Sequence, residues 1–165
     1  MNANTKLKKA SGFTIIEVVL VLAIAGLIFL IVFLALPALQ RSQRDTQRRS
    51  DVGRVVSQIT QFQSNSNGAV PPATAAGFAN SFVPTYMNAG GDTFQDPRGN
   101  TYNYVYGAGA AANGNAVVGT SRTSEIRYAT SARCGAGGAI TGGGNTRQVA
   151  VSIGLEGGGA YCTQN

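Results

Sequence analysis

The chain has no histidine and no tryptophan among its 165 residues, and only 12% of its residues are charged. The absence of histidine removes the side chain that most often serves as general base, metal ligand or triad member. Catalysis by carboxylates alone stays open, but no nucleophile–base pair stands out in the sequence. We therefore expect no enzyme, and hence no catalytic residue, no cofactor and no metal site.

Cysteine is scarce, with only Cys134 and Cys162, both in the C-terminal third. In a chain exported across a membrane, an isolated pair indicates one disulfide. Closing a loop of that size stabilises a domain by roughly 3–4 kcal/mol in the chain-entropy model. The alternative is a cytosolic protein with two free, buried thiols.

Positive charge is unevenly spread, although the net charge is +6. Basic residues flank a single apolar run: Lys6, Lys8 and Lys9 precede it, and Arg41, Arg44, Arg48, Arg49 and Arg54 follow it. Basic flanks suit membrane headgroups at least as well as nucleic acid. No aromatic residues interleave with the arginines, so DNA binding is the weaker interpretation.

The apolar run covers residues 13–36, where only Thr14 and Glu17 are polar. It is long enough to span a bilayer, which takes about 20 apolar residues in a helix. A conventional secretory signal has an apolar region of only about 7–15 residues, and cleavage at the mid-run tripeptide Ala23-Ile24-Ala25 would leave an apolar stub. A plain permanent anchor remains an alternative. The cysteine pair indicates that the C-terminal side is exported.

The junction before this run, residues 8–17, reads KKASGFTIIE. A short basic leader ends in glycine, and an aromatic residue then opens an apolar helix that carries one acid in its first turns. This segment resembles the leader of type IV prepilins, in which Gly-Phe-Thr is followed by Glu at the fifth mature position. The resemblance implies that a prepilin peptidase cuts after Gly12 and N-methylates Phe13.

Glu17 is the one charge in the apolar run. A carboxylate near the membrane centre costs on the order of 2.5 kcal/mol or more, so it needs a partner. Cleavage after Gly12 would create an amine at Phe13, four residues upstream at the positive end of the helix dipole. Glu17 would pair with this amine or, as the resemblance implies, with that of a neighbouring subunit. The alternative is a capping box formed by Thr14 and Glu17.

Two residues are expected to weaken the helix, Gly26 and Pro37. Glycine lowers helix propensity, and proline removes a helical hydrogen bond, so we expect loosening between them. In the family that the junction resembles, the corresponding proline falls somewhat earlier in the chain.

Residues 40–51 are polar all round, and we expect solvated intrahelical pairs of Asp45 with Arg48 and Arg49, and of Asp51 with Arg54. An apolar face then follows at helical spacing: Val52, Val55, Val56, Ile59 and Phe62. This stripe indicates that the helix, running from about 13 to 62, packs on the domain that follows.

The remainder is rich in glycine and turn residues. We expect a helix near 74–82, a β-turn at Asp96–Gly99 and strands at 102–106, 115–119, 125–130 and 148–155. In the last strand Val149, Val151, Ile153 and Leu155 alternate and are expected to face the helix. The segment from Asp96 to Tyr102 also resembles a loop of type II secretion pseudopilins. Asp92, Asp96 and Glu125 are too sparse for a calcium site.

The predicted fold is α+β, with a long N-terminal helix packed on a small antiparallel sheet. We expect a leader at 1–12, an apolar helix at 13–36, a polar and then amphipathic helix at 37–63 and a domain at 64–165. The resemblance implies a pilin that is inserted in the cytoplasmic membrane and then polymerises into an extracellular filament. Its partners would be a prepilin peptidase, an assembly platform with its ATPase, and copies of itself. The alternatives are a pseudopilin or competence pilin, and a single-pass anchored binding domain.

Overall fold

The computed structural model describes residues 12–89, 91, 93–107 and 123–165. The chain divides into two compact units, Met1–Leu39 and Gln40–Asn165. The expected strand at 115–119 lies outside the described residues.

Helix α1 spans Ile15–Asn65. It ends where Asn67 and Gly68 take positive φ angles of 52° and 82°, and the Gly68 N–H donates to the Gln63 carbonyl at 2.7 Å. This closure satisfies a carbonyl of the last turn and needs the left-handed conformation that glycine adopts easily. Pro37 lies within α1, so the helix does not end there.

The second unit holds a four-stranded sheet in the order β1-β2-β5-β6. Its strands are β1 Asn103–Tyr106, β2 Glu125–Thr130, β5 Val149–Gly154 and β6 Ala160–Gln164. The α+β class is thus confirmed, but the expectation of an antiparallel sheet is wrong for one pair, since β1 and β2 run parallel. A parallel pair needs a crossover of a dozen or more residues, and the sequence between β1 and β2 has that length.

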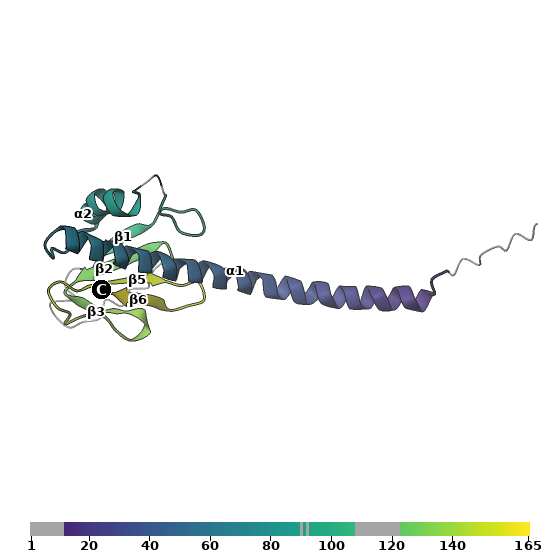
Figure 1. Cartoon of the computed structure of the whole chain (residues 1–165). Helices are drawn as coiled ribbons and strands as arrows, with labels where there is room; N and C mark the ends of the chain where they lie inside the picture. Colours follow the sequence, from purple (N-terminus) through teal and green to yellow (C-terminus); the bar gives the residue numbers. More distant parts are fainter. Residues whose placement is uncertain (1–11, 90, 92, 108–122) are drawn as a thin grey trace, which may run out of the picture. The chain divides into compact units, whose positions relative to one another are not determined.

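The main core lies between this sheet and the part of α1 after Leu39 (Figure 1). From the helix, Val52, Val55 and Ile59 are fully buried, as the apolar stripe predicts. The sheet supplies Ile126, Tyr128, Val149, Val151 and Ile153 to the same cluster. Three of the four predicted inward-facing residues of the last strand, Val149, Val151 and Ile153, therefore pack with the helix. The expectation is wrong for Leu155, because β5 ends at Gly154 and Leu155 is only partly buried outside this cluster.

The opposite face of β5 is also buried, which strict alternation does not predict. A second, two-stranded sheet packs there, formed by β3 Ala132–Cys134 and β4 Ile140–Gly142. Ala150 joins Ala129, Ala132 and Ile140 in a separate cluster on that side. The sheet is therefore covered on both sides at its centre.

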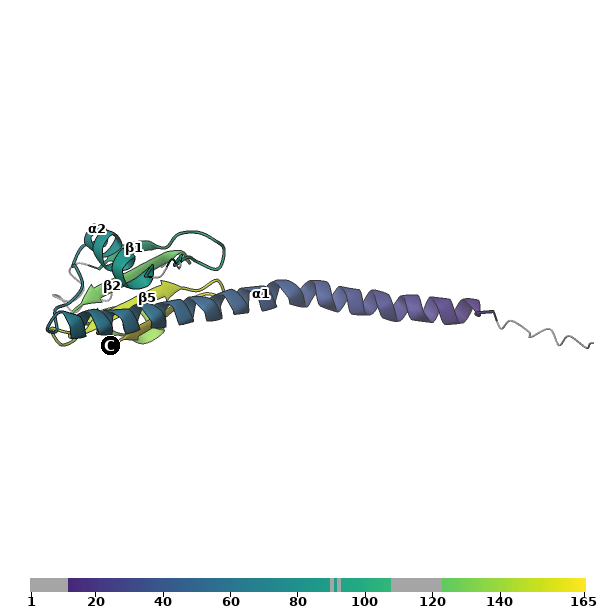
Figure 2. The ribbon, with the colours of Figure 1, turned by 45° about the horizontal axis from the view of Figure 1, so that its top comes forward.

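Two short helical segments complete the unit beside β1: α2 Ala75–Gly77 and the π-helix η1 Phe78–Met87 (Figure 2). The sequence predicts helix at 74–82, and the structure extends it to Met87. Thr74 caps the start, because its side chain accepts from the Gly77 N–H at 3.1 Å. A 3₁₀ turn, η2 Ala136–Gly138, joins β3 to β4.

Candidate functional site

Gly12, Phe13 and Thr14 directly precede α1 and belong to no helix or strand. Thr14 caps the helix, because the Glu17 N–H donates to its side-chain oxygen at 3.3 Å. This is one of the two hydrogen bonds of a capping box, which is the alternative to a pairing of Glu17 with an amine. It uses the backbone of Glu17 and leaves the carboxylate free to act elsewhere.

Gly12 and Gly26 have no local steric reason to be glycine. A Cβ placed on either residue would meet no neighbouring atom within 4 Å, and neither residue has a positive φ angle. A requirement for glycine at position 12 would therefore come from another protein, such as a peptidase, that recognises this segment. The roles of Gly12 in cleavage and of Gly26 and Pro37 in helix flexibility stay predictions.

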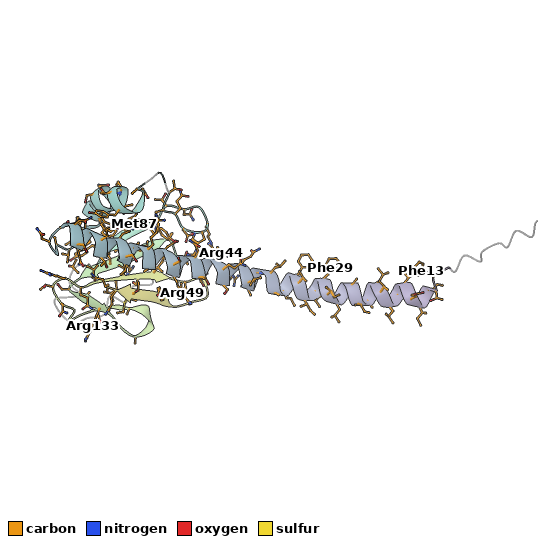
Figure 3. All side chains as sticks on the ribbon, in the orientation of Figure 1. Phe13, Phe29, Arg44, Arg49, Met87 and Arg133 are labelled. Atoms are coloured by element: carbon orange, nitrogen blue, oxygen red, sulfur yellow. A yellow bond between two sulfur atoms is a disulfide. The ribbon has the colours of Figure 1, made fainter. Side chains whose placement is uncertain are left out.

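The first unit exposes its apolar side chains. In the described part of the chain, every large apolar residue that is exposed lies between Phe13 and Leu39. Phe13 is 84% exposed and Phe33 is 72% exposed, and Figure 3 shows Phe13 and Phe29 projecting from α1. Each such side chain forgoes about 1.5–3 kcal/mol of burial free energy in water. Lipid or other apolar helices must therefore cover this surface.

Glu17 is exposed within this apolar surface. Its carboxylate makes no ion pair with any residue that the structure describes. A lone carboxylate among apolar side chains is costly once lipid covers them. The site therefore has an unused negative charge next to the position where cleavage would create an amine.

The second unit contains a buried charge cluster that the sequence did not predict. Arg48 is 0% exposed, and its guanidinium donates to both oxygens of Asp96, at 2.6 and 3.1 Å. It also pairs with Asp45 at 3.1 Å and with Glu156 at 2.7 Å. The expectation of solvated intrahelical pairs is therefore wrong for Arg48. Its strongest partners come from distant loops that shield it from water.

Glu156 holds the other side of this cluster. One of its oxygens lies 2.8 Å from both Arg44 and Arg98. The loop that carries it also donates the N–H groups of Glu156 and Gly157 to Asp45, each at 2.8 Å. Three arginines and three carboxylates thus balance in charge, and they fasten the 96–98 turn and the β5–β6 loop to α1. Figure 3 labels Arg44 on this part of the helix.

The pKa shifts follow from these contacts. The hydrogen bond from Arg44, with help from Arg48 and Arg98, holds the pKa of the Glu156 carboxyl far below its usual range. Burial by itself would raise the pKa of Asp45, but the backbone N–H groups of Glu156 and Gly157 outweigh it and the pKa is lowered. The carboxylates of Asp45 and Glu156 are therefore ionised throughout the physiological range.

Asp51 is also buried, at 7% exposed, instead of solvated as expected. It accepts hydrogen bonds from the Tyr102 hydroxyl at 2.6 Å and from the Gln47 amide at 3.1 Å. Burial and this carboxylate together raise the pKa of Tyr102. Of the residues weighed for calcium, Asp96 pairs with Arg48 and Glu125 with Arg127, while Asp92 lies outside the described residues.

Cys134 and Cys162 are joined in a disulfide with a Cα–Cα distance of 5.7 Å, so the predicted pairing is confirmed. The bond links β3 to β6 and so ties the small second sheet to the edge of the main one. The two partly buried cysteines also pack against the cluster around Ala150.

Removing this disulfide is expected to lower the free energy of unfolding by about 3 kcal/mol, because the unfolded chain regains the entropy of an open loop. The test is denaturant unfolding of the full chain in detergent micelles, for the wild type and for a variant with both Cys134→Ala and Cys162→Ala. Reductant should destabilise the wild type and leave the double variant unchanged. Equal stability of the two proteins under oxidising conditions would contradict the prediction.

These observations define a class of protein. Near its N-terminus the chain has a helix that is long and apolar enough to cross a membrane, and a disulfide-bonded α+β domain follows. More particularly, residues 7–33 match the family model of the prokaryotic N-terminal methylation motif. The chain thus carries the class III signal peptide of type IV pilins, ahead of a long apolar helix. No curated protein and no solved structure matches the chain.

The match is limited to the N-terminal segment, and it supports a prepilin-processed, type IV pilin-like protein. The motif implies processing by a prepilin peptidase and handling by pilus-type machinery. With the apolar helix, it fits a membrane-anchored precursor. The motif is that of a structural family and not of an enzyme family.

Proposed function

We propose that the chain is the subunit of a type IV pilus-like surface filament. In this proposal residues 1–12 are removed as a leader, and residues 13–36 serve first as membrane anchor and then as filament core. Residues 37–63 form the polar and then amphipathic part of the helix, and residues 64–165 form the surface domain. The protein acts by polymerising with copies of itself and catalyses no reaction.

One observation carries this proposal: the continuous apolar surface of residues 13–39 contains a single carboxylate, Glu17, that has no ionic partner in the described chain. A plain membrane anchor needs no charge there, and the charge makes insertion less favourable. A bundle of such helices would bury the apolar side chains on each other and would offer each Glu17 the amine of a neighbouring Phe13.

The partners in this proposal are a prepilin peptidase, an assembly platform with its ATPase and the cytoplasmic membrane that holds the precursor. The filament itself is extracellular. Phe13 supplies the amine after cleavage, Glu17 supplies the carboxylate, and Gly26 and Pro37 allow the helix to loosen during packing.

The deciding measurement is the intact mass of the protein in material sheared from cell surfaces. We expect a chain that begins at Phe13, is heavier by one methyl group and retains the Cys134–Cys162 disulfide. A mass that begins at Met1 or Asn2, found only in the membrane fraction, would contradict both cleavage and filament formation.

Amine labelling gives an independent check of the same cleavage. The lysines of the sequence are Lys6, Lys8 and Lys9, all ahead of Gly12. The processed chain should therefore carry no ε-amine and take up no label on side chains, whereas the precursor should take up label at the three lysines.

A second candidate function is a pseudopilin of a type II secretion or competence machine. The turn at Asp96–Gly99 favours it, because this segment resembles a pseudopilin loop and the structure forms the turn, with Gly99 N–H donating to Asp96 at 2.7 Å. Processed protein that shearing does not release from the cell surface would favour this candidate over the surface filament.

A further inference from the structure

Arg41 and Arg44 are the first charged residues of the second unit, which begins at Gln40. They are three residues apart on α1, so their side chains leave the helix as neighbours. Arg41 is exposed, and its side chain makes no ion pair in the described part of the chain. The fold therefore leaves the charge of Arg41 unused.

A third arginine reaches the same place from a different segment. The Nη2 atoms of Arg44 and Arg98 each lie 2.8 Å from the same oxygen of Glu156, so the two guanidinium groups are neighbours. Arg98 belongs to the turn that Asp96 fastens to Arg48 of the helix. Folding thus gathers Arg41, Arg44 and Arg98 into one arginine face.

The guanidinium groups of this face meet the solvent, whereas its carboxylates do not. The side chains of Arg98 and Arg44 are 52% and 26% exposed, against 6% for Glu156. A guanidinium has five N–H donors, and Arg44 uses only its Nε and Nη2 atoms on Glu156. Arginine donates paired N–H groups to the oxygens of a phosphate, so the arginine face suits such an anion.

Phosphates of a bilayer are within reach of this face. The apolar run ends at Leu36, five residues before Arg41, and five residues of α-helix rise about 7.5 Å. The polar layer of a bilayer is about 5–7 Å thick on each side of its hydrocarbon core. A long arginine side chain also extends readily into that layer. Arg41 therefore lies at headgroup depth when the run spans a membrane.

From the exposed guanidinium groups of Arg41, Arg44 and Arg98 and their place directly after the apolar run, we propose that the arginine face binds the phosphate of an anionic phospholipid. This inference rests on the membrane-held precursor of the proposed function. Arg41 supplies a net positive charge, while Arg44 and Arg98, whose charges are balanced by buried carboxylates, supply N–H donors. A zwitterionic headgroup would bring its own cation beside the arginines and bind less well.

The test is native mass spectrometry of the full chain in detergent micelles with equal amounts of phosphatidylglycerol and phosphatidylcholine of the same acyl chains. The wild type should retain phosphatidylglycerol in at least fivefold excess. Arg41→Gln should lower its retention about fivefold, because one arginine near an anionic surface contributes about 1 kcal/mol. Arg98→Gln should also lower retention, but less, since Glu156 already balances part of its charge.

Arg133→Gln is the matched control, because it makes the same change at an exposed arginine on β3. Figure 3 labels Arg133 and Arg44 well apart in the second unit. This variant should retain lipid like the wild type. An excess of soluble glycerol phosphate should not displace the lipid, since the acyl chains hold the headgroup beside the arginine face.

Four outcomes would overturn the proposal. They are equal retention of the two lipids by the wild type, equal losses in Arg41→Gln and Arg133→Gln, and displacement of the lipid by glycerol phosphate, which would assign the face to a free anion. The fourth is normal lipid retention by an Arg41→Gln protein that forms no filaments, which would assign Arg41 to a contact with a second copy of the chain. Lipid retention requires neither cleavage nor assembly, so its failure is distinguishable from a failure of the proposed filament function.

Discussion

Glu17→Ala is expected to abolish filament assembly and to leave cleavage after Gly12 intact. The carboxylate is the one charge on the apolar surface of residues 13–39, and it lies four residues from the amine that cleavage creates. Two opposite charges about 4 Å apart attract by on the order of 4 kcal/mol at the effective dielectric constant of protein surfaces, and by more in an apolar bundle. Without Glu17 a buried amine would remain without a partner, which penalises every subunit that is added.

The measurement is the amount of filament sheared from cells, together with the intact mass of the subunit that remains in the membrane. Val18→Ala is the matched control, because it shortens a neighbouring exposed side chain without changing charge, and it should assemble. Glu17→Gln separates charge from size and should fail like Glu17→Ala. Normal filaments from both Glu17 variants would show that the pairing is not needed.

Arg48→Met is expected to lower the free energy of unfolding by about 3–5 kcal/mol, since it leaves the carboxylates of a buried ion cluster without their shared cation. Arg48 is fully buried and bonded to Asp45, Asp96 and Glu156. The measurement is denaturant unfolding of the full chain in detergent micelles. The neighbouring Arg49→Met is the control, because Arg49 is exposed and stacks at 5.8 Å over Tyr161, a contact worth about 0.5–1 kcal/mol.

The pH dependence of this difference distinguishes a lost ion cluster from lost packing. In the wild type the pKa values of Asp45 and Glu156 lie below their unfolded values of 3.8 and 4.5. The stability that these carboxylates contribute is therefore complete above about pH 5 and is lost as the pH falls toward their folded pKa values. The gap between wild type and Arg48→Met should narrow between about pH 5 and pH 3. A gap that stays constant would assign the effect to the volume of the side chain.

Local patterns were good predictors wherever the information lies in neighbouring residues. The stripe of Val52, Val55 and Ile59 repeats with the helical period, and these side chains are buried against the sheet. The junction at Gly12 and Phe13 is a contiguous motif, and the family model that matches residues 7–33 includes it. The Cys134–Cys162 disulfide could be predicted from the sequence once the chain was assumed to be exported.

The buried charge cluster shows where local reasoning fails. Asp45 and Arg48 have the spacing of an ordinary surface pair on a helix, and nothing near them in the sequence indicates burial. Their other partners, Asp96 and Glu156, lie in loops far along the chain. The sequence nevertheless contains a weak signal. Asp96 begins a β-turn and Glu156 precedes three glycines, so both carboxylates lie in loops that could bring them to an arginine on the helix.

The sequence also does not predict which strands pair or in which direction they run. The pattern of Tyr102 to Tyr106 predicts a strand but carries no direction, so the parallel pairing with β2 had to come from the fold. Ala150 and Ser152 look like the polar or neutral face of an edge strand, yet both are buried because other segments cover them.

The sequence by itself determined the N-terminal methylation motif at residues 7–33, the apolar helix with its single carboxylate and the helical face that meets the domain, because each depends on the order and period of adjacent residues. Only the tertiary structure decided that Arg48 is the centre of a buried ion cluster, that β1 runs parallel to β2 and that β5 is covered on both faces. Those features depend on contacts between residues far apart in the chain. Such contacts form when the total free energy of apolar burial, hydrogen bonding and ion pairing over the whole domain favours them.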